Sequence, residues 1–324
     1  MTSRRDFIAG LGAGALSAGV PLGKLAHGLE PPLYPPMNLS RFATPVTPAP
    51  SDIKWGCAAI TWGGNDMQAI EDIAALGFAG IQLRSNVLTQ FGTRPAALRE
   101  LLAQHHLTLA AFSSGAVPVE PTLEAETVAS HTSHARFVHD VGGLYLQVTD
   151  ERPRGRPVVA ADYERLGRLL TAIGRASADL GVSLGYHNHV GALGEGPDAV
   201  DRILAAADPR YVKLLLDVAH YQQGGGDPVQ AIRRYHDRLL LLHIKDLESP
   251  APGSPYRFVE LGRGKVDLAG VFAALEAVKF RGWAVVELDA VPDNARTPKE
   301  SARISKQFLE GRLGVWQPSP RAAP

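Results

Sequence analysis

The sequence predicts an α/β protein built on a single (β/α)8 barrel, and three observations lead to this fold class. Short apolar runs rich in β-branched residues alternate with helical patterns eight times between residues 53 and 313. Continuous apolar strands with intervening helices are typical of a parallel sheet that helices cover. Eight such units within about 260 residues match a closed barrel, whose usual size is about 250 residues. An open, doubly wound sheet is the alternative, but no Gly-x-Gly-x-x-Gly motif follows the first apolar run.

The first four units occupy residues 53–180. Each begins with an apolar run that predicts a strand, and these runs read IKWGCAAITW, AGIQLRS, LTLAAFSS and GLYLQVTD. Each run is followed by a stretch with helical periodicity. The predicted helices cover residues 66–76, 94–105, 123–141 and 161–180.

The last four units occupy residues 182–313 and follow the same pattern. Their strand runs read VSLGYHNH, VKLLLDVAH, LLLLHIKDL and WAVVELD. The nearly unbroken apolar character of these runs is what strands buried on both faces require. The helices predicted after them cover residues 198–206, 228–235, 268–279 and 298–313.

Composition limits the classes of function and of metal site. The 324 residues are 45% hydrophobic, enough for one large core or two modest ones. The 33 basic and 33 acidic residues balance, so no charged surface for nucleic acid or an anionic membrane is predicted. Cys57 is the one cysteine, which excludes an intrachain disulfide and a multi-cysteine zinc site. A metal would therefore be bound by histidines and carboxylates.

The N-terminal residues 1–28 are predicted to be a targeting signal rather than part of the fold. SRRDFI is followed by the weakly apolar run AGLGAGALSAGVPLG, a pattern that resembles a twin-arginine export signal. The run is glycine-rich and shorter than the roughly 20 residues of a spanning helix, so a stable membrane anchor is not expected. Cleavage is expected near Ala26-His27-Gly28. The signal predicts recognition by the twin-arginine export machinery and a periplasmic protein.

The rest of the chain divides into a linker, the barrel and a tail. Residues 29–52 contain PPLYPP and TPVTPAP, which predict a proline-rich extended linker. The barrel is predicted over residues 53–315, and a flexible tail over residues 316–324. Nothing in the sequence decides between a monomer and an oligomer.

Polar side chains follow the apolar part of six predicted strands. Active sites of such barrels lie at the C-terminal ends of the strands, so we expect these side chains to line one pocket. A single Asp at a strand end is more often a turn residue or helix cap, and a single buried His is more often a core residue. Agreement in phase over six strands favours a shared pocket. The residues are Gln82, Arg84, Gln147, Thr149, His187, His189, Asp217, His243, Lys245, Glu287 and Asp289.

The run VSLGYHNH carries two histidines on one face of a predicted strand. Alternation along the strand places Gly185, His187 and His189 on one face, and Tyr186 and Asn188 on the other. Neutral imidazole is the commonest metal ligand in proteins. The run therefore supplies the beginning of a metal site if other strands bring partners.

Several of these motifs resemble those of one family. LLLDVAHYQQGGGDP, LLLLHIKDL, VELGRGKVDLAGVF and WAVVELD, taken with YHNH, resemble the xylose-isomerase-like TIM barrel family of sugar phosphate isomerases and epimerases. The resemblance covers about Ile53 to Leu313. It implies one divalent cation, held by a ligand from each of strands five to eight. In the family this cation is commonly manganese, cobalt, magnesium or zinc.

The resemblance implies a set of four metal ligands. The Asp of strand six corresponds to Asp217, the His of strand seven to His243 and the Glu of strand eight to Glu287. At strand five many members have Glu, and this chain has His187. Two His with two carboxylates suit Mn, Co, Zn or Fe better than Ca or Mg.

The family's chemistry begins with the removal of a proton next to a carbonyl, which gives an enediolate. The resemblance therefore implies a metal-dependent isomerase or epimerase of a sugar or keto sugar, with the cation stabilising the developing charge. Glu287 is expected to be the base, with His189 or Lys245 returning the proton or protonating a leaving hydroxyl. Residues expected to contact the carbohydrate substrate are His220, Gln147, Arg84, Gln82 and Arg152.

Two alternative functions stay open. Epimerases of the family typically use two metal-bound glutamates, and this chain keeps one, so elimination of water is an alternative. HNHVGALGEG also resembles the corresponding stretch of inosose dehydratases in the same family. Such a lyase would act on a keto-cyclitol or a 3-keto-glycoside. The second alternative is a sugar-binding barrel without catalysis.

The arginines of ERPRGRPVV follow the fourth predicted strand, beside the expected pocket. Arg152, Arg154 and Arg156 have the geometry to bind a phosphate or carboxylate. A solvated loop explains them at least as well. A periplasmic location lowers the expectation of a phosphorylated substrate.

Other histidines and aromatic residues are expected to be structural. His131 and His134 share one face of helix 123–141, and their polar neighbours indicate a solvated surface. Trp55, Trp62 and Phe112 are expected in the core.

Overall fold

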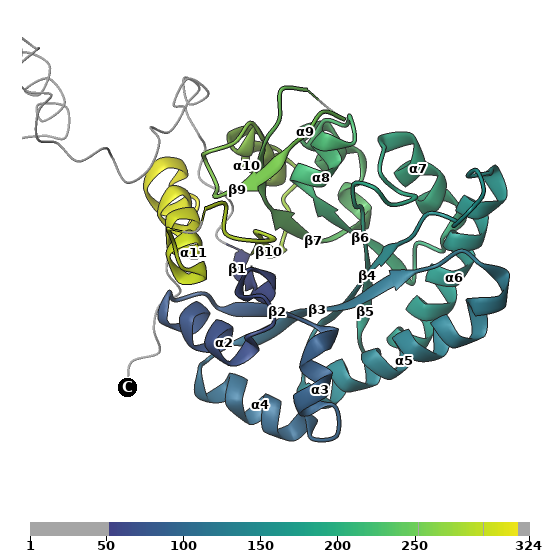
Figure 1. Cartoon of the computed structure of the whole chain (residues 1–324), viewed down its shortest axis with the longest axis horizontal. Coiled ribbons are helices and arrows are strands. Elements are labelled where there is room, and N and C mark those ends of the chain that lie inside the picture. The colour runs from purple at the N-terminus through teal and green to yellow at the C-terminus, as the bar shows by residue number, and fades with distance from the viewer. Residues whose placement is uncertain (1–51, 252, 294, 317–324) are drawn as a thin grey trace, which may run out of the picture. The chain divides into compact units, whose positions relative to one another are not determined.

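The computed structural model describes residues 52–251, 253–293 and 295–316. Eight parallel strands close into a barrel in the order β1-β10-β7-β6-β5-β4-β3-β2, and helices lie outside it (Figure 1). The predicted (β/α)8 fold class is confirmed. The barrel strands are β1 (Ile53–Ala58), β2 (Gly80–Arg84), β3 (Thr108–Val117), β4 (Tyr145–Asp150), β5 (Ser183–His187), β6 (Val212–Asp217), β7 (Leu239–Ile244) and β10 (Gly282–Val286).

The predicted signal segment and all but the last residue of the predicted linker lie outside the described residues. In the described part of the chain, no helix is long and apolar enough to cross a membrane.

Each barrel strand is followed by helical structure, as predicted. Several helices begin at a proline, whose fixed φ suits the first helical position. The α-helices are α2 (Asp66–Ala75), α3 (Leu88–Phe91), α4 (Pro95–Gln104), α5 (Glu124–Val141), α6 (Ala160–Ala178), α7 (Pro197–Ala206), α8 (Val218–Gln223), α9 (Pro228–Arg234), α10 (Leu268–Ala277) and α11 (Pro298–Gln307). Short 3₁₀ turns are η3 (Ala59–Trp62), η4 (Ser85–Val87), η5 (Pro121–Leu123) and η6 (His236–Arg238), and η7 (Phe308–Leu313) is a π-helix that continues α11.

The sixth strand is shorter than predicted. It ends at Asp217, whose Oδ1 accepts hydrogen bonds from the backbone N–H groups of Ala219 (2.9 Å) and His220 (2.8 Å). Asp217 is therefore the N-cap of α8, and the run expected as strand up to His220 turns into a helix.

A two-stranded antiparallel hairpin, β8 (Asp246–Glu248) with β9 (Arg257–Val259), follows β7 and was not predicted. Asp246 holds the chain that returns from it. Its carboxylate accepts backbone N–H bonds from Gly262 (3.0 Å), Gly264 (2.9 Å) and Val266 (3.0 Å).

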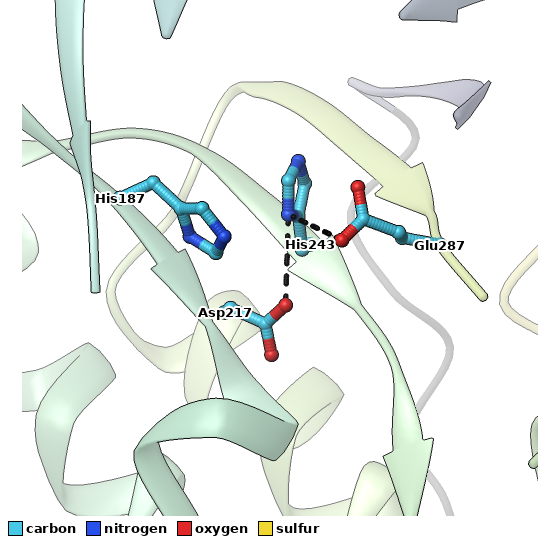
Figure 2. A group of neighbouring side chains, drawn as sticks. All are labelled: His187, Asp217, His243 and Glu287. Carbon is cyan, nitrogen blue, oxygen red and sulfur yellow. Dashed lines mark ion pairs between the residues drawn. The ribbon is translucent and has the colours of Figure 1, made fainter. Parts of the chain in front are cut away.

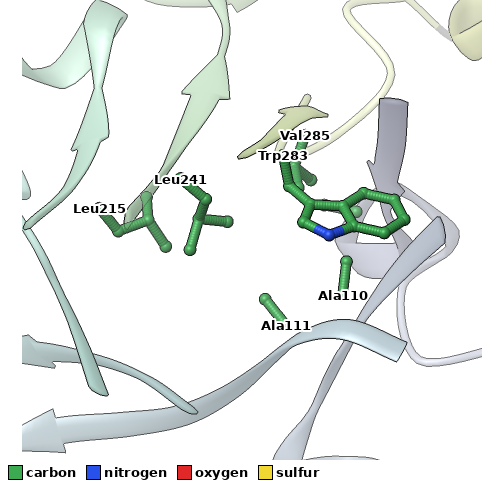
Figure 3. Close-up of a cluster of buried hydrophobic side chains, with 7 residues drawn as sticks. Ala110, Ala111, Leu215, Leu241, Trp283 and Val285 are labelled. Atoms are coloured by element: carbon green, nitrogen blue, oxygen red, sulfur yellow. The ribbon is translucent and has the colours of Figure 1, made fainter. Parts of the chain in front are cut away.

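An apolar cluster fills the barrel beneath the polar strand ends (Figure 3). Leu215, Leu241 and Val285 each precede a polar residue by two positions, so they point into the barrel one step below it. Gly80 leaves room for the indole of Trp283. A Cβ at Gly80 would lie 2.3 Å from that ring.

Aromatic residues close the core near the C-terminal end of the described chain. The rings of Trp55 and Trp316 stack with centroids 5.0 Å apart, and Phe78 packs edge-on against Trp316. Trp55, Trp62 and Phe112 are buried, which confirms their assignment to the core. Trp316 is buried as well, so the packed structure includes this first residue of the predicted tail.

The prediction of a solvated surface at His131 and His134 is wrong. His131 is 4% exposed, and the Nδ1 atoms of His131 and His134 lie 2.6 and 2.7 Å from the hydroxyl of Ser114. The face of α5 that carries these histidines packs on β3, and the polar neighbours point elsewhere. Burial and the charge of His134 lower the pKa of His131 to about 4.

Candidate functional site

Four predicted metal ligands meet at the C-terminal ends of neighbouring strands. His187 ends β5, Asp217 ends β6, His243 lies on β7 and Glu287 follows β10. One ligand atom from each lies within 4.8 Å of the others. Figure 2 shows His243 between the carboxylates of Asp217 and Glu287, with His187 facing the group. The barrel thus brings together residues that are up to 100 positions apart in the chain.

Three of these side chains have a buried polar atom without a hydrogen-bond partner in the described part of the chain. The atoms are His187 Nδ1, Asp217 Oδ2 and His243 Nδ1. Unpartnered buried polar atoms are rare in native proteins. His243 Nδ1 lies 3.6 Å from Asp217 Oδ2 and 3.3 Å from Glu287 Oε1. Two nitrogens and two oxygens that converge in this way fit a divalent cation such as zinc.

Gln82 fixes the orientation of two ligands. Its Nε2 donates to Gln147 Oε1 (3.1 Å) and to Glu287 Oε2 (3.3 Å), so its Oε1 is the acceptor for His243 Nε2 at 2.8 Å. With its Nε2 proton committed to Gln82, His243 presents Nδ1 to the cluster. Hydrogen bonds that orient ligands from behind are typical of protein metal sites.

Asp217 is oriented by the backbone. Oδ1 caps α8, which leaves Oδ2 directed at the cluster. Asn188, on the opposite face of its strand from His187, accepts a hydrogen bond from the Asp217 N–H at 3.0 Å. The first turn of α8 and the end of β5 therefore hold this carboxylate in place.

The charges of the cluster shift its protonation equilibria strongly. Burial opposes a charge on His243, but the carboxylates of Glu287 and Asp217 raise its pKa to about 9. Burial and the neighbouring His243 hold the pKa of His187 well below its usual range. Burial opposes a charge on Glu287, but His243 and Lys245 lower its pKa. The site therefore favours the ionised form of Glu287 and places positive charge next to it.

Lys245 lies next to the ligand set and is fully buried. Its Nζ is 3.1 Å from Glu287 Oε1 and 2.5 Å from Asp289 Oδ1. The ring centroid of Phe258, on the hairpin, is 4.0 Å from the same atom. Burial opposes the ammonium, but Glu287, Asp217 and Asp289 raise the pKa of Lys245. Lys245 is thus a cation placed beside the expected base.

His189 and His220 stack on one another with ring centroids 3.9 Å apart. His189 Nδ1 lies 2.7 Å from the carbonyl oxygen of Val190, to which it donates, so Nε2 is the acceptor nitrogen. His189 lines the pocket at the four predicted ligands. His220, expected to contact the substrate, is 1% exposed and lies beneath Phe258, with ring centroids 4.9 Å apart.

A cavity of about 230 Å³ opens at the cluster, and one side of it carries neutral polar groups. His187, His189, Glu287 and Asp289 form the other side, while Arg84 is exposed at the rim. Both carboxylates of this lining come from the end of β10. The neutral polar side chains are Gln82, Ser113, Gln147 and Thr149.

The arginines after β4 lie away from this cavity. Arg152 lines a separate cavity and pairs with Glu195 at 2.8 Å. Arg154 pairs with Glu151, and Arg156 pairs with the Asp162 carboxylate at 2.6 Å. Each of these guanidinium groups pairs with an acidic side chain of the protein. The prediction that Arg152 contacts the substrate in this pocket is therefore wrong, because Arg152 lies in the separate cavity.

Sequence reasoning missed Phe258 and the orienting role of Gln82. Phe258 lies on the short hairpin. The one sequence feature that could have pointed to it is an aromatic residue in a long connection after a barrel strand. Gln82 was expected to contact substrate. Gln82 and Glu287 are 205 positions apart, so the sequence gives no sign of the hydrogen bond between them.

Comparison with known proteins agrees with this architecture. Residues 70–310 match the model of the family described as xylose isomerase-like TIM barrel. The chain is 25% identical over 304 residues to the inosose dehydratase of Lacticaseibacillus casei, a match that covers 82% of this chain and 99% of that protein.

Two solved structures share the fold at lower sequence identity. An IOLI protein with a bound zinc atom has a TM-score of 0.70 at 17% identity, covering 82% of this chain and all of that one. A D-allulose 3-epimerase from Methylomonas sp. has a TM-score of 0.67 at 21% identity, with the same coverage. Because the family model matches most of its length, this chain belongs to the xylose isomerase-like TIM barrel family.

Proposed function

We propose that the protein is a divalent-metal-dependent carbon–oxygen lyase that removes water from a keto-cyclitol or keto sugar. The observation that carries this proposal is the placement of an acid beside a base. Lys245 Nζ lies 3.1 Å from Glu287 Oε1, and both carboxylates of the pocket come from the end of β10. A proton and a hydroxyl can then leave from the same face of the substrate. The similarity to inosose dehydratases supports the same reaction.

His187, Asp217, His243 and Glu287 would hold the cation. When bound, it supplies positive charge that polarises the substrate carbonyl and stabilises the negative charge that develops next to it. The zinc atom bound by the IOLI protein, which shares this fold, supports a metal-dependent function, and two His with two carboxylates suit Zn, Mn, Co or Fe.

The protein's own groups move the protons. Glu287 takes the proton from the carbon next to the carbonyl, and the electron pair of that bond forms the new double bond as hydroxide leaves. The Glu287 carboxylate raises the pKa of Lys245. Protonation of Glu287 removes this effect. Lys245 is then a better acid at the moment when the hydroxyl departs and takes up a proton as water.

Epimerisation is a second candidate, and one observation favours it. His189 donates its Nδ1 proton to Val190, so Nε2 is available as a base or acid on the β5 side of the pocket, away from β10. A proton removed by Glu287 could be returned there to the other face. The fold shared with D-allulose 3-epimerase is consistent with this reaction.

Turnover in deuterated water separates the two reactions. The metal-loaded protein is incubated with an inosose and with keto sugars, and the products are followed by proton NMR. The lyase predicts a new vinyl or enol signal and an enone product that has lost water. Deuterium next to the carbonyl without loss of water would contradict the lyase. Loss of turnover in a folded Glu287→Gln variant would exclude a sugar-binding barrel without catalysis.

We also propose export to the periplasm by the twin-arginine route, on the basis of Arg4 and Arg5 ahead of the weakly apolar run. Fusion of residues 1–52 to a reporter in a bacterium tests this. Export should require the export machinery and stop in a variant with both arginines changed to lysine. Export that persists in that variant would contradict it.

A further inference from the structure

The hairpin of β8 and β9 carries an aromatic side chain that the proposed reaction does not use. Tyr256 directly precedes β9, and at 38% exposure it is one of three exposed large hydrophobic side chains in the described part of the chain. Its ring packs against Phe258, with centroids 5.3 Å apart. Side chains two positions apart in an extended segment share one face. Tyr256 therefore lies on the side of the hairpin that faces Lys245, which Phe258 contacts.

Tyr256 ends a row of rings that begins in the cavity at the four predicted ligands, which we call the barrel-mouth pocket. His189 lines this pocket and stacks on His220, with centroids 3.9 Å apart. Phe258 covers His220, and Tyr256 follows Phe258 toward the surface. Burial and the charge of Asp289, which also lines the pocket, raise the pKa of the Tyr256 phenol. Ring contacts and charge thus place Tyr256 at the mouth of this pocket.

Hydrogen bonds hold the hairpin on both sides of Tyr256. At the start of β8, the buried carboxylate of Asp246 accepts the N–H of Leu247 (2.9 Å), in addition to three N–H groups of the chain that returns from β9. Ahead of β9, the carbonyl oxygen of Ser254 accepts a hydrogen bond from Nε2 of Gln223, at the end of α8 (3.0 Å). The ring of Tyr256 is therefore held in place before a substrate arrives.

The barrel mouth has two unlike sides. Its neutral amide and hydroxyl groups lie on β2, β3 and β4, whereas the row of rings comes from the segments that follow β5, β6 and β7. A closed polyol ring carries hydroxyls around its edge and C–H bonds on its faces. Its hydroxyls can bond to the neutral polar side while one C–H face packs on an aromatic ring. An open-chain polyol has no such flat face.

We propose that Tyr256 is a specificity-determining residue, whose ring packs on a C–H face of the substrate and selects closed rings over open-chain keto sugars. This inference rests on the lyase function proposed above and assigns a residue to the choice of its substrate. The contact covers the exposed ring of Tyr256, so apolar burial contributes to binding. It lies away from Lys245 and Glu287, so it acts on binding rather than on the transfer of protons.

Binding of two polyols tests this without turnover. myo-Inositol is a closed ring, and D-glucitol is an open chain with the same number of carbons and hydroxyls. Ligand-observed NMR titrations of the metal-loaded protein should show tighter binding of myo-inositol. Tyr256→Ala should weaken myo-inositol binding by about tenfold, the scale of one aromatic contact, and D-glucitol binding by less than about twofold. Tyr256→Phe keeps the ring and should bind both polyols as the wild type does.

Tyr211→Ala is the matched control. Tyr211 is also a partly exposed tyrosine, but it directly precedes β6, at the end of the barrel opposite the pocket, and lies against Arg175 and Arg210. This variant should leave both affinities unchanged. Tyr256→Leu keeps an apolar side chain without a ring, and it should lose the preference for myo-inositol as Tyr256→Ala does. The two variants at Tyr256 therefore test the ring separately from the fold of the hairpin.

Kinetics separate this inference from the lyase function. With an inosose as substrate, Tyr256→Ala should raise KM about tenfold and change kcat by less than about twofold. If the metal-loaded wild type consumes no ketone, the proposed lyase function fails, and the polyol titrations still decide the role of Tyr256. Equal affinity of wild type and Tyr256→Ala for myo-inositol, no binding of myo-inositol, or tighter binding of D-glucitol would overturn the inference.

Discussion

Two pairs of neighbouring histidines differ in the partner of Nδ1. In His131 and His134, between α5 and β3, both Nδ1 atoms face the hydroxyl of Ser114 at 2.6 and 2.7 Å. In His187 and His243, at the strand ends, both Nδ1 atoms lack a hydrogen-bond partner within the described residues. Burial lowers the pKa of His131 and His187 alike. Burial alone therefore does not distinguish a metal ligand, and the proposed ligands rest on missing partners in convergent geometry.

Removal of a ligand should have the largest effect. His187→Ala takes away one of four donors, and we expect the affinity for zinc or cobalt to fall by at least about 100-fold, more than changes behind the ligands cost. Metal content after dialysis and titration with a chromophoric chelator measure this. His131→Ala is the control and should bind metal as the wild type does. Equal losses in the two variants would erase the distinction between the pairs.

His131, which shares the hydroxyl of Ser114 with His134, should make the free energy of unfolding depend on pH. The folded-state pKa of His131, about 4, lies below its value of 6.5 when unfolded. Between these values the unfolded chain takes up a proton that the folded chain excludes, so stability is lost as the pH falls from about 6.5 to about 4, by up to about 3 kcal/mol.

Urea denaturation of metal-free protein at pH 7 and at pH 4.5 measures this loss. Other groups titrate over the same range, so the quantity to compare is the difference between wild type and His131→Gln. The variant should lose less stability. An identical pH dependence in both proteins would show that His131 is accessible to protons when folded.

Gln82 provides a test of the orientation of His243. Gln82→Met keeps the volume but removes the acceptor for His243 Nε2 and the donor to Glu287. We expect metal affinity to fall by about 10- to 100-fold, as for other hydrogen bonds behind metal ligands. Gln68→Met, which removes a hydrogen bond to Asp72 on α2, should leave metal affinity unchanged. Unchanged affinity in Gln82→Met would mean that Nδ1 is presented without help from Gln82.

Loss of the shared hydroxyl should have the smallest effect. Ser114→Ala leaves the Nδ1 atoms of His131 and His134 without this partner, and we expect a loss of about 1–3 kcal/mol in the free energy of unfolding. Ser133→Ala, at an exposed position of α5 whose hydroxyl donates to the carbonyl oxygen of Ser130, serves as control. Metal affinity at the strand ends should be the same in both. A gain of metal binding at His131 would show that a missing partner is enough to make a site.

The sequence allowed prediction of the fold and of the polar pocket because both depend on periodicity, whereas the choice of four ligands within that pocket came from the resemblance to the family. Apolar runs separated by helices predict the barrel, and a polar residue two positions beyond an inward Leu or Val predicts the pocket, as for Leu215 and Asp217. The environment of His131 was not predictable, because Ser130 and Thr132 beside it suggest a solvated face while the tertiary contact with β3 is invisible in the sequence.

Details that depend on three-dimensional contacts escaped prediction for the same reason. Asp217 ends its strand because its own carboxylate caps α8. The apolar residues on both sides of Asp217 led to the prediction that the strand continues. Arg152 follows β4 closely, yet its pairing with Glu195 on the next loop directs it to a separate cavity. The packing of Phe258 on Lys245 requires a hairpin whose strands are three residues each.

The most direct test of the metal centre is a crystal structure of the protein soaked with zinc, with data collected at the zinc absorption edge. The account predicts one anomalous peak at the barrel mouth, about 2.0–2.2 Å from His187 Nδ1, Asp217 Oδ2, His243 Nδ1 and a Glu287 oxygen. A barrel mouth without a peak at saturating zinc, or a peak bound by other residues, would contradict the central claim.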